Sequence, residues 1–265
     1  MGELSGKPKV AIMRPERYIK ESKELAESMG FEAVMVPMVE ITEMRDDGFD
    51  GFVERILEGS SDYVIFTSAN GIDFTLNKIP SESREDFITA LNSTKVVAIG
   101  PTTRKALEKL GIDVMGMPGV YSSEGIVDYL CADVRDKVID TARSFYGSTL
   151  LTEGLRKCGA KVYETNVYTL EKPEGEKQDG LIDATLNGEI GVFAFTSSMM
   201  VRNFLEHARN RGQEKDTVNA LNNSLVAAIG GPTAKTLEGY GVNVSAIPDK
   251  FTFKEVLKKV QEQLS

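Results

Sequence analysis

The chain has 265 residues, enough for one large α/β domain or for two domains of about 130 residues each. Its 40 acidic and 31 basic residues leave a net charge of −9, which argues against a nucleic-acid backbone as a partner. No apolar run approaches the roughly 18 residues of a membrane span, and residues 1–10 lack the apolar stretch of a signal peptide. We therefore expect a cytoplasmic protein with no membrane partner.

Strand-like runs alternate with helical patterns along the whole chain. Strands are predicted at 9–12, 33–37, 64–66, 96–99, 137–140, 162–168 and 192–195. Several of these runs are entirely apolar, which is typical of strands buried on both faces of a parallel sheet. Helices are expected to end at Gly111 and Gly241, and the capping-box spacing of Thr252 and Glu255 predicts the start of a last helix. This alternation predicts an α/β fold with parallel sheets.

An internal repeat divides the chain into two similar halves. Residues 98–118 and 228–248 align without gaps at an offset of 130, and 10 of 21 positions are identical. The segments 63–69 and 192–198 match in the same way at an offset of 129. This period is too long for a solenoid and fits two copies of one α/β domain.

Two cysteines and one histidine limit the available chemistry. Cys131 and Cys158 lack CxxC or metal-ligand spacing, which argues against a zinc site, and the single histidine makes a Ser–His or Cys–His triad improbable. We expect Cys158, at a predicted helix end, to be a small core residue and His207, in a polar run, to be solvated. No metal or cofactor is predicted, so chemistry must use hydroxyls, carboxylates, guanidiniums and backbone amides.

Four loops rich in small hydroxyl residues follow predicted strands. They are Thr67-Ser68-Ala69-Asn70, Gly100-Pro101-Thr102-Thr103, Thr196-Ser197-Ser198 and Gly230-Gly231-Pro232-Thr233. In an open parallel sheet ligands bind at the carboxyl ends of the strands, where the next helix presents unpaired N–H groups that attract anions. The alternative is that these side chains only cap helices. Because the set occurs twice at matched positions, both interpretations stay open.

Four further residues are candidates for the same edge. Arg14 follows the first strand and has the donors for a bidentate carboxylate clamp, or is an ordinary surface arginine. Ser122 and Ser123 open a helix after Pro118, as caps or as ligand donors. Tyr168 ends a predicted strand, and as a strand tyrosine it needs no function.

Together these segments resemble the uroporphyrinogen-III synthase family. The resemblance runs from Arg14 through the four hydroxyl loops, the 122–125 segment and Tyr168, and so covers nearly the whole chain. It implies two similar flavodoxin-like domains with parallel sheets: a discontinuous first domain of 1–38 with 172–265, and a second domain of 41–169. Neighbouring segments at 38–41 and 169–172 would form a two-segment hinge, and we expect a monomer. The repeat alone would suggest a cut near residue 130.

The substrate that the resemblance implies is hydroxymethylbilane, a linear tetrapyrrole with eight carboxylates. Ring A loses its hydroxyl as water, the substituted carbon of ring D attacks, and a spiro intermediate fragments so that ring D re-closes inverted. The protein's main task is geometric, to bring the correct carbon to the electrophile. Family members often carry an arginine-containing stretch about twenty residues before the tyrosine; here Arg143 is the possible substitute.

Candidate roles follow from the loops and the resemblance together. The predicted catalytic residues are Tyr168, as general acid for the departing hydroxyl, and Thr103, with Thr233 as a further candidate. The predicted substrate-binding residues are Arg14, Thr67, Ser68, Ala69, Asn70, Thr102, Ser122, Ser123, Thr196, Ser197, Ser198, Gly231 and Thr233. The alternative function is a non-catalytic two-lobed binding module for a small anionic ligand.

Overall fold

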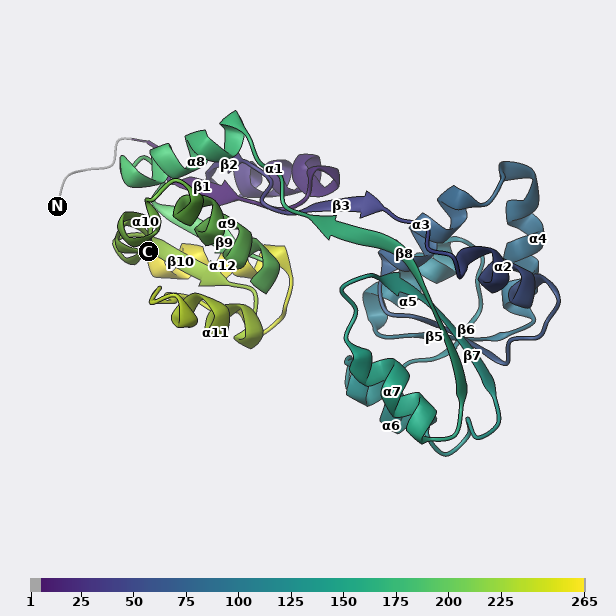
Figure 1. Cartoon of the computed structure of the whole chain (residues 1–265). Helices are drawn as coiled ribbons and strands as arrows, with labels where there is room; N and C mark the ends of the chain where they lie inside the picture. The colour runs from purple at the N-terminus through teal and green to yellow at the C-terminus, as the bar shows by residue number, and fades with distance from the viewer. Residues whose placement is uncertain (1–5, 265) are drawn as a thin grey trace. The chain divides into compact units, whose positions relative to one another are not determined.

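A computed structural model describes residues 6–264, and its contacts divide the chain into two compact units (Figure 1). Unit 1 combines the residues up to Glu40 with those from Glu171 onward, and unit 2 spans Ile41–Leu170. Each unit contains a sheet whose carboxyl edge carries the segments of interest. None of the helices within residues 6–264 is long and apolar enough to cross a membrane.

Unit 1 has a four-stranded sheet in the order β10-β9-β1-β2. Its strands are β1 (Lys9–Ile12), β2 (Glu32–Met35), β9 (Val192–Phe195) and β10 (Leu225–Ala228), all parallel. Ala246 adds a parallel bridge to Ala227 beside β10. The helical segments are η1 (Glu16–Tyr18), α1 (Ile19–Ser28), α8 (Glu176–Leu186), α9 (Ser198–Asn210), α10 (Glu214–Asn222), α11 (Gly231–Gly239) and α12 (Phe253–Leu264).

Unit 2 has a six-stranded sheet in the order β3-β8-β7-β4-β5-β6. Its strands are β3 (Glu40–Glu43), β4 (Tyr63–Phe66), β5 (Lys95–Ala98), β6 (Val114–Gly116), β7 (Val138–Ser144) and β8 (Lys161–Glu171). The pairs from β8 to β6 are parallel. The helical segments are α2 (Phe49–Leu57), α3 (Ala69–Lys78), η2 (Ser81–Ser83), α4 (Arg84–Asn92), α5 (Pro101–Lys109), α6 (Ser123–Leu130) and α7 (Thr149–Lys157). The predicted α/β fold with parallel sheets is confirmed.

The two sheets share one strand arrangement, assembled from exchanged halves of the sequence. If β1 and β7 are each counted as strand one of their unit, both sheets contain the order 2-1-3-4-5, with Ala246 in the fifth place of unit 1 and β3 as an additional edge strand of unit 2. Strands three to five of unit 2 come from the first half of the chain, and those of unit 1 come from the second half. The repeat therefore has a period of 130 although the chain does not divide at residue 130.

Local sequence explains most element boundaries. The apolar runs of β4 and β9 are buried at every residue, as expected of central parallel strands. Gly111 and Gly241 follow α5 and α11 with φ of 76° and 80°, a conformation that favours glycine. Thr252 Oγ1 accepts a hydrogen bond from the Glu255 amide at 3.3 Å, so the predicted cap of α12 is confirmed.

The first connection between the units is held firmly where it leaves unit 1. The buried side chain of Gln178 donates a hydrogen bond to the carbonyl of Pro37 at 2.9 Å, and buried Asn203 donates to that of Met38 at 2.7 Å. The chain then enters β3, which neighbours β8, the strand that carries the second connection. The predicted hinge segments thus lie partly within paired strands.

The expectations for two single residues need correction. Cys158 packs against the core as expected but is only partly buried, and it forms an unexpected disulfide with Cys131 that joins the ends of α6 and α7. His207 is not solvated: its side chain is buried in α9, and Nε2 lies 2.9 Å from Oδ1 of Asp179 in α8. Helix packing, which a sequence pattern does not reveal, makes both contacts.

The disulfide is expected to contribute measurably to the unfolding free energy of the protein. It closes a loop with a sequence separation of 27, so the Cys131→Ser/Cys158→Ser double variant is expected to lose about 2–4 kcal/mol of unfolding free energy. Urea unfolding of both proteins measures the difference. Thiol titration of the unreduced, denatured wild type should find no free thiol, and two free thiols with unchanged stability would contradict the assignment.

Candidate active site

The carboxyl edge of the unit 2 sheet brings Ser68 and Tyr168 together at the start of α3. The Tyr168 hydroxyl lies 3.0 Å from Oγ of Ser68, which also accepts the Gly71 amide at 3.2 Å and so caps the helix. A Cβ on Gly71 would lie 2.5 Å from the carbonyl oxygen of Ala142 in β7. Glycine therefore lets the first turn of α3 approach β7, beside the point where strand order reverses and ligands bind in such sheets.

A register shift in β8 orients Tyr168. Arg143 pairs with Asn166 and Ser144 with Tyr168, so Val167 is the extra residue of a bulge. Bulges redirect side chains and are frequent next to active sites. Here the Tyr168 ring, only 7% exposed, stacks on Phe74 of α3 at 5.5 Å between centroids. Its hydroxyl is thereby held against the cap of the same helix.

Lys78 secures this arrangement from the other end of α3. Its Nζ donates hydrogen bonds to the carbonyls of Val167 (2.7 Å) and Phe74 (2.9 Å) and lies 3.4 Å from Oε1 of Glu43. The side chain is 3% exposed, and burial lowers the pKa of its ammonium group while Glu43 opposes the shift. The residue ties the bulge to α3. In the sequence it is indistinguishable from a surface lysine at a helix end.

The neighbouring helix starts of unit 2 carry the other predicted residues. Thr103 lies in the first turn of α5 and is 4% exposed, whereas Thr102 beside it is exposed. Ser122 caps α6 by accepting the Gly125 amide at 3.1 Å, and Ser123 is the first residue of that helix. The capping interpretation therefore holds for Ser122 as it does for Ser68. Capping uses the hydroxyl oxygen as an acceptor and leaves its hydrogen available to a ligand.

The matching edge of unit 1 joins two of the predicted loops. Ser197 caps α9 by accepting the Met200 amide at 3.2 Å, and Ser198 Oγ donates to the carbonyl of Pro232 in α11 at 3.1 Å. Thr233, in the first turn of α11, is 3% exposed. The starts of α9 and α11 thus lie side by side, with Thr196 preceding one cap and Gly231 beginning the other helix.

Arg14 lies at the carboxyl edge of the unit 1 sheet and is held by contacts within the unit. Arg14 follows β1 and donates a hydrogen bond from Nη1 to Ser22 Oγ at 2.8 Å. Its Cζ lies over the rings of Tyr18 and Phe253, 4.7 and 5.1 Å from the ring centroids. Burial lowers the pKa of its guanidinium, and Glu21 and Tyr18 oppose the shift. These contacts fix the orientation of Arg14 at the edge next to β9.

Arg143 does not serve as a substitute carboxylate contact at the surface. Its side chain is 2% exposed, Nη2 donates to the Ser148 carbonyl at 2.8 Å, and Nε lies 3.3 Å from Oε1 of Glu164. A Cβ on Gly147 would collide with its guanidinium. Arg143 therefore orders the loop between β7 and α7 from inside.

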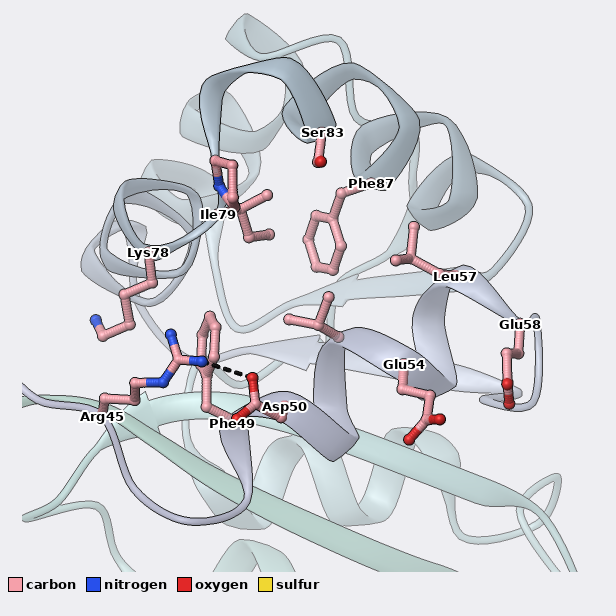
Figure 2. Close-up of a pocket in the computed structure, with 12 residues that line it drawn as sticks. Arg45, Phe49, Asp50, Glu54, Leu57, Glu58, Lys78, Ile79, Ser83 and Phe87 are labelled. Carbon is pink, nitrogen blue, oxygen red and sulfur yellow. Dashed lines mark hydrogen bonds and ion pairs between the residues drawn. The ribbon is translucent and has the colours of Figure 1, made fainter.

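A separate cavity of about 600 Å³ lies between α2, the end of α3 and α4 (Figure 2). Phe49, Val53, Ile79 and Phe87 give it apolar walls, and Figure 2 shows Arg45 and Asp50 paired at its rim. None of its lining residues was predicted as a site residue, and none lies in the loops that follow β4 to β7. The predicted site residues thus do not line this cavity.

Comparison with known proteins assigns the chain to a family. The family model described as uroporphyrinogen-III synthase HemD matches residues 20–258. The chain belongs to the uroporphyrinogen-III synthase family. A Chlorobaculum parvum protein named uroporphyrinogen-III synthase is 25% identical over 96% of this chain and 98% of its own length. A Methanothermobacter thermautotrophicus protein named as a candidate for the same enzyme is 29% identical over 94% and 95%.

Solved structures of this family share the fold. A mutant uroporphyrinogen III synthase from the extremely thermophilic bacterium Thermus thermophilus has a TM-score of 0.68 and 22% identity, covering 97% of this chain and 98% of its own. The uroporphyrinogen-III synthetase of Helicobacter pylori has a TM-score of 0.62 and 16% identity, with 98% and 100% covered. The two-domain α/β architecture is therefore that of the uroporphyrinogen-III synthase family.

Lys78 provides a test of how Tyr168 is positioned. Lys78→Met leaves the Val167 carbonyl without its donor and is expected to lower the unfolding free energy by about 1–3 kcal/mol. Folding lowers the pKa of Lys78, so the unfolded chain binds more protons than the folded one as the pH approaches the usual lysine value of about 10.4. The unfolding free energy of the wild type therefore receives a favourable contribution from Lys78 that grows as the pH rises toward that value. The stability deficit of the variant should therefore widen from neutral to alkaline pH in urea titrations.

The control for this variant is Lys109→Met, at the exposed end of α5. It makes the same chemical change where the lysine has no buried carbonyl to hold. Equal stability losses in the two variants at every pH would contradict a positioning role for Lys78.

Proposed function

We propose that this protein is a uroporphyrinogen-III synthase that converts hydroxymethylbilane into uroporphyrinogen III and water. The hydroxymethyl C–O bond of ring A breaks, and the hydroxyl leaves as water. The substituted carbon of ring D then attacks the electrophilic methylene carbon of ring A and forms a spiro intermediate. This intermediate fragments by breaking the old bond between that ring D carbon and the methylene carbon on ring C. The free carbon of ring D then bonds to the ring C methylene carbon and loses its proton. One hydroxyl and one ring hydrogen leave, so the net reaction eliminates one water and makes the enzyme a cyclising hydro-lyase.

The observation that carries this proposal is the family match over residues 20–258. It is supported by the coincidence of the predicted loops with helix starts at the carboxyl edges of both sheets. These features fit a flexible polyanionic substrate that must be folded before it reacts.

The substrate carboxylates are proposed to bind backbone amides rather than lysines. The first turns of α3, α5, α9 and α11 each present N–H groups without a partner inside the helix, and each helix dipole adds about 0.3–1 kcal/mol per anion. Pro101 removes one amide from α5 at its first position, and Pro232 removes one from α11 at its second. Neutral donors allow a protein of net charge −9 to bind an octacarboxylate.

Tyr168 is the proposed general acid. Its hydroxyl protonates the leaving oxygen, and the proton released when ring D re-closes balances the one that was given up. The neighbouring Ser68 hydroxyl, at 3.0 Å, stabilises the developing phenolate by donating a hydrogen bond. A positioned acid contributes a factor of about 10²–10⁴. Thr103 and Thr233, both buried in the first turns of their helices, are the secondary candidates.

Other features of the proposal have independent tests. We propose a cytoplasmic monomer with no nucleic-acid partner. Analytical ultracentrifugation tests the monomer directly. The Cys131–Cys158 disulfide is of a kind that is uncommon in reducing compartments outside hyperthermophiles.

The decisive experiment incubates the protein with fresh hydroxymethylbilane and separates the product isomers by chromatography. The proposal expects isomer III to form faster than the spontaneous reaction, which yields isomer I. A protein that binds the substrate but leaves isomer I as the product would be a binding module instead.

Tyr168→Phe tests the general acid. The change removes one hydroxyl and keeps the ring, so turnover is expected to fall about ten- to a hundredfold while the enzymatic product stays isomer III. The matched control is Tyr63→Phe, which removes the hydroxyl of another buried strand tyrosine, bonded to Lys95 at 3.3 Å. Full activity of Tyr168→Phe, or a loss that matches its loss of thermal stability, would exclude the role.

Ala69→Pro and Ser198→Pro test the amide model. Each residue is the first of its helix, a position that accepts proline, as Pro101 shows in α5. Ala69→Pro loses only the N–H, and Ser198→Pro loses the N–H together with the Oγ that donates to Pro232, so substrate affinity is expected to fall about tenfold or more with the helix intact. Ala69→Gly and Ser198→Ala keep the amide and serve as controls. Wild-type KM in both proline variants would show that these amides do not bind carboxylates.

A further inference from the structure

Each unit places an exposed aromatic ring beside the start of one of these helices. Tyr121 in unit 2 is 59% exposed, and Phe251 in unit 1 is 70% exposed. Both lie at the carboxyl edge, in the loops that lead into α6 and α12. The two positions differ by 130, the offset of the internal repeat, although the surrounding residues are not identical.

The main chain holds both rings in the same way. The Ser122 amide donates to the Val120 carbonyl at 2.9 Å, and the Thr252 amide donates to the Lys250 carbonyl at 2.8 Å. Each ring therefore stands at the centre of a three-residue turn. The next residue, Ser122 or Thr252, then caps the following helix. Tyr121 and Phe251 thus occupy equivalent positions in two hydrogen-bonded turns.

Each ring rests on the glycine that precedes the neighbouring helix. A Cβ on Gly100 would lie 3.3 Å from Cγ of Tyr121, and a Cβ on Gly230 would lie 3.2 Å from Cδ1 of Phe251. The two glycines have φ of −170° and −176°, extended backbone that any residue adopts. Their backbone conformation therefore does not require glycine, but a Cβ there would push the ring back by a few tenths of an ångström. One face of each ring covers the cap of α5 or α11, and the rest remains open.

Helix capping alone does not account for this exposure. An apolar residue just before a cap often packs on the fourth residue of the helix, here Ile126 or Val256. Both of these are fully buried, while the rings remain more than half exposed. An exposed aromatic surface beside unpaired amides matches a ligand that combines flat apolar rings with carboxylates.

We propose that Tyr121 and Phe251 are binding residues that stack on pyrrole rings of the tetrapyrrole, while the first turns of α5 and α11 take its carboxylates. The inference rests on the proposed function and adds to it the contact for the apolar part of the substrate. Aromatic stacking acts on bound substrate and transition state alike, so it should appear in affinity rather than in turnover.

The test measures KM and kcat for hydroxymethylbilane and the Kd of uroporphyrinogen III, the latter by calorimetry without oxygen. Tyr121→Ala and Phe251→Ala are each expected to raise KM and Kd about five- to tenfold, with kcat within about twofold of wild type. Tyr121→Phe should bind normally. Leu57→Ala and Leu264→Ala remove side chains of 48% and 49% exposure at the ends of α2 and α12, away from the carboxyl edges, and should change neither constant.

A double-mutant cycle tests whether the contact between Gly100 and Tyr121 positions the ring. Gly100→Ala should raise Kd about threefold in the wild type by displacing Tyr121, and should have no effect in Tyr121→Ala. Equal effects in both backgrounds would overturn the seating, and unchanged Kd in both alanine variants would overturn the inference. So would an affinity loss that only follows a loss of thermal stability.

The outcomes separate this inference from the proposed function. If the wild-type protein makes isomer III and the ring variants bind normally, the proposed function is supported and a binding role for Tyr121 and Phe251 is excluded. If the wild-type protein binds uroporphyrinogen III but does not make isomer III, the proposed function is excluded. The Kd values of the wild type and the ring variants then decide whether the rings bind the tetrapyrrole. Wild-type protein that binds no tetrapyrrole overturns both.

Discussion

The unpaired amides in the first turn of a helix that follows a parallel strand are the constraint on which this structure depends. A parallel sheet aligns these helix starts at one edge, and the residues there must leave the amides accessible. Ser68 and Ser197 each accept the amide of only the third residue of their helix, while Gly100 and Gly230 have no side chain that could occupy an amide. The helix starts therefore attract anions without a charge of their own, which fits the polycarboxylate substrate proposed for this acidic chain.

The exchange of halves between the units determines which part of the chain provides the strands and helix starts at each edge. Each unit takes strands one and two from one half of the repeat and strands three to five from the other, so the chain must pass between units twice. Both passages use neighbouring strands, β3 and β8, and β8 also carries Tyr168. The proposed acid is thus part of the strand that connects the units. Lys78 stabilises that region by bonding to the carbonyl of Val167 and lying close to Glu43 of β3.

Sequence patterns predicted what depends on local periodicity. Buried strands such as β4 and β9, the glycine helix ends at Gly111 and Gly241, and the cap at Thr252 follow from apolar runs, backbone freedom and hydrogen-bond spacing. Contacts between distant segments were not predictable in this way. The pairing of Cys131 with Cys158, the burial of His207 against Asp179 and the burial of Arg143 each depend on helix or loop packing. The bulge at Val167 and the donors of Lys78 depend on strand register, which one sequence does not specify.

Backbone amide resonances measured with and without uroporphyrinogen III test the central claim most directly. If carboxylates bind the helix starts, the amides of Ala69, Asn70, Thr102 and Thr103 in unit 2, and of Ser198, Gly231 and Thr233 in unit 1, should shift and gain protection from hydrogen exchange. Residues that line the cavity between α2 and α4, such as Val53 and Ser83, should remain unchanged. Changes confined to that cavity, or no response at the helix starts, would contradict the account.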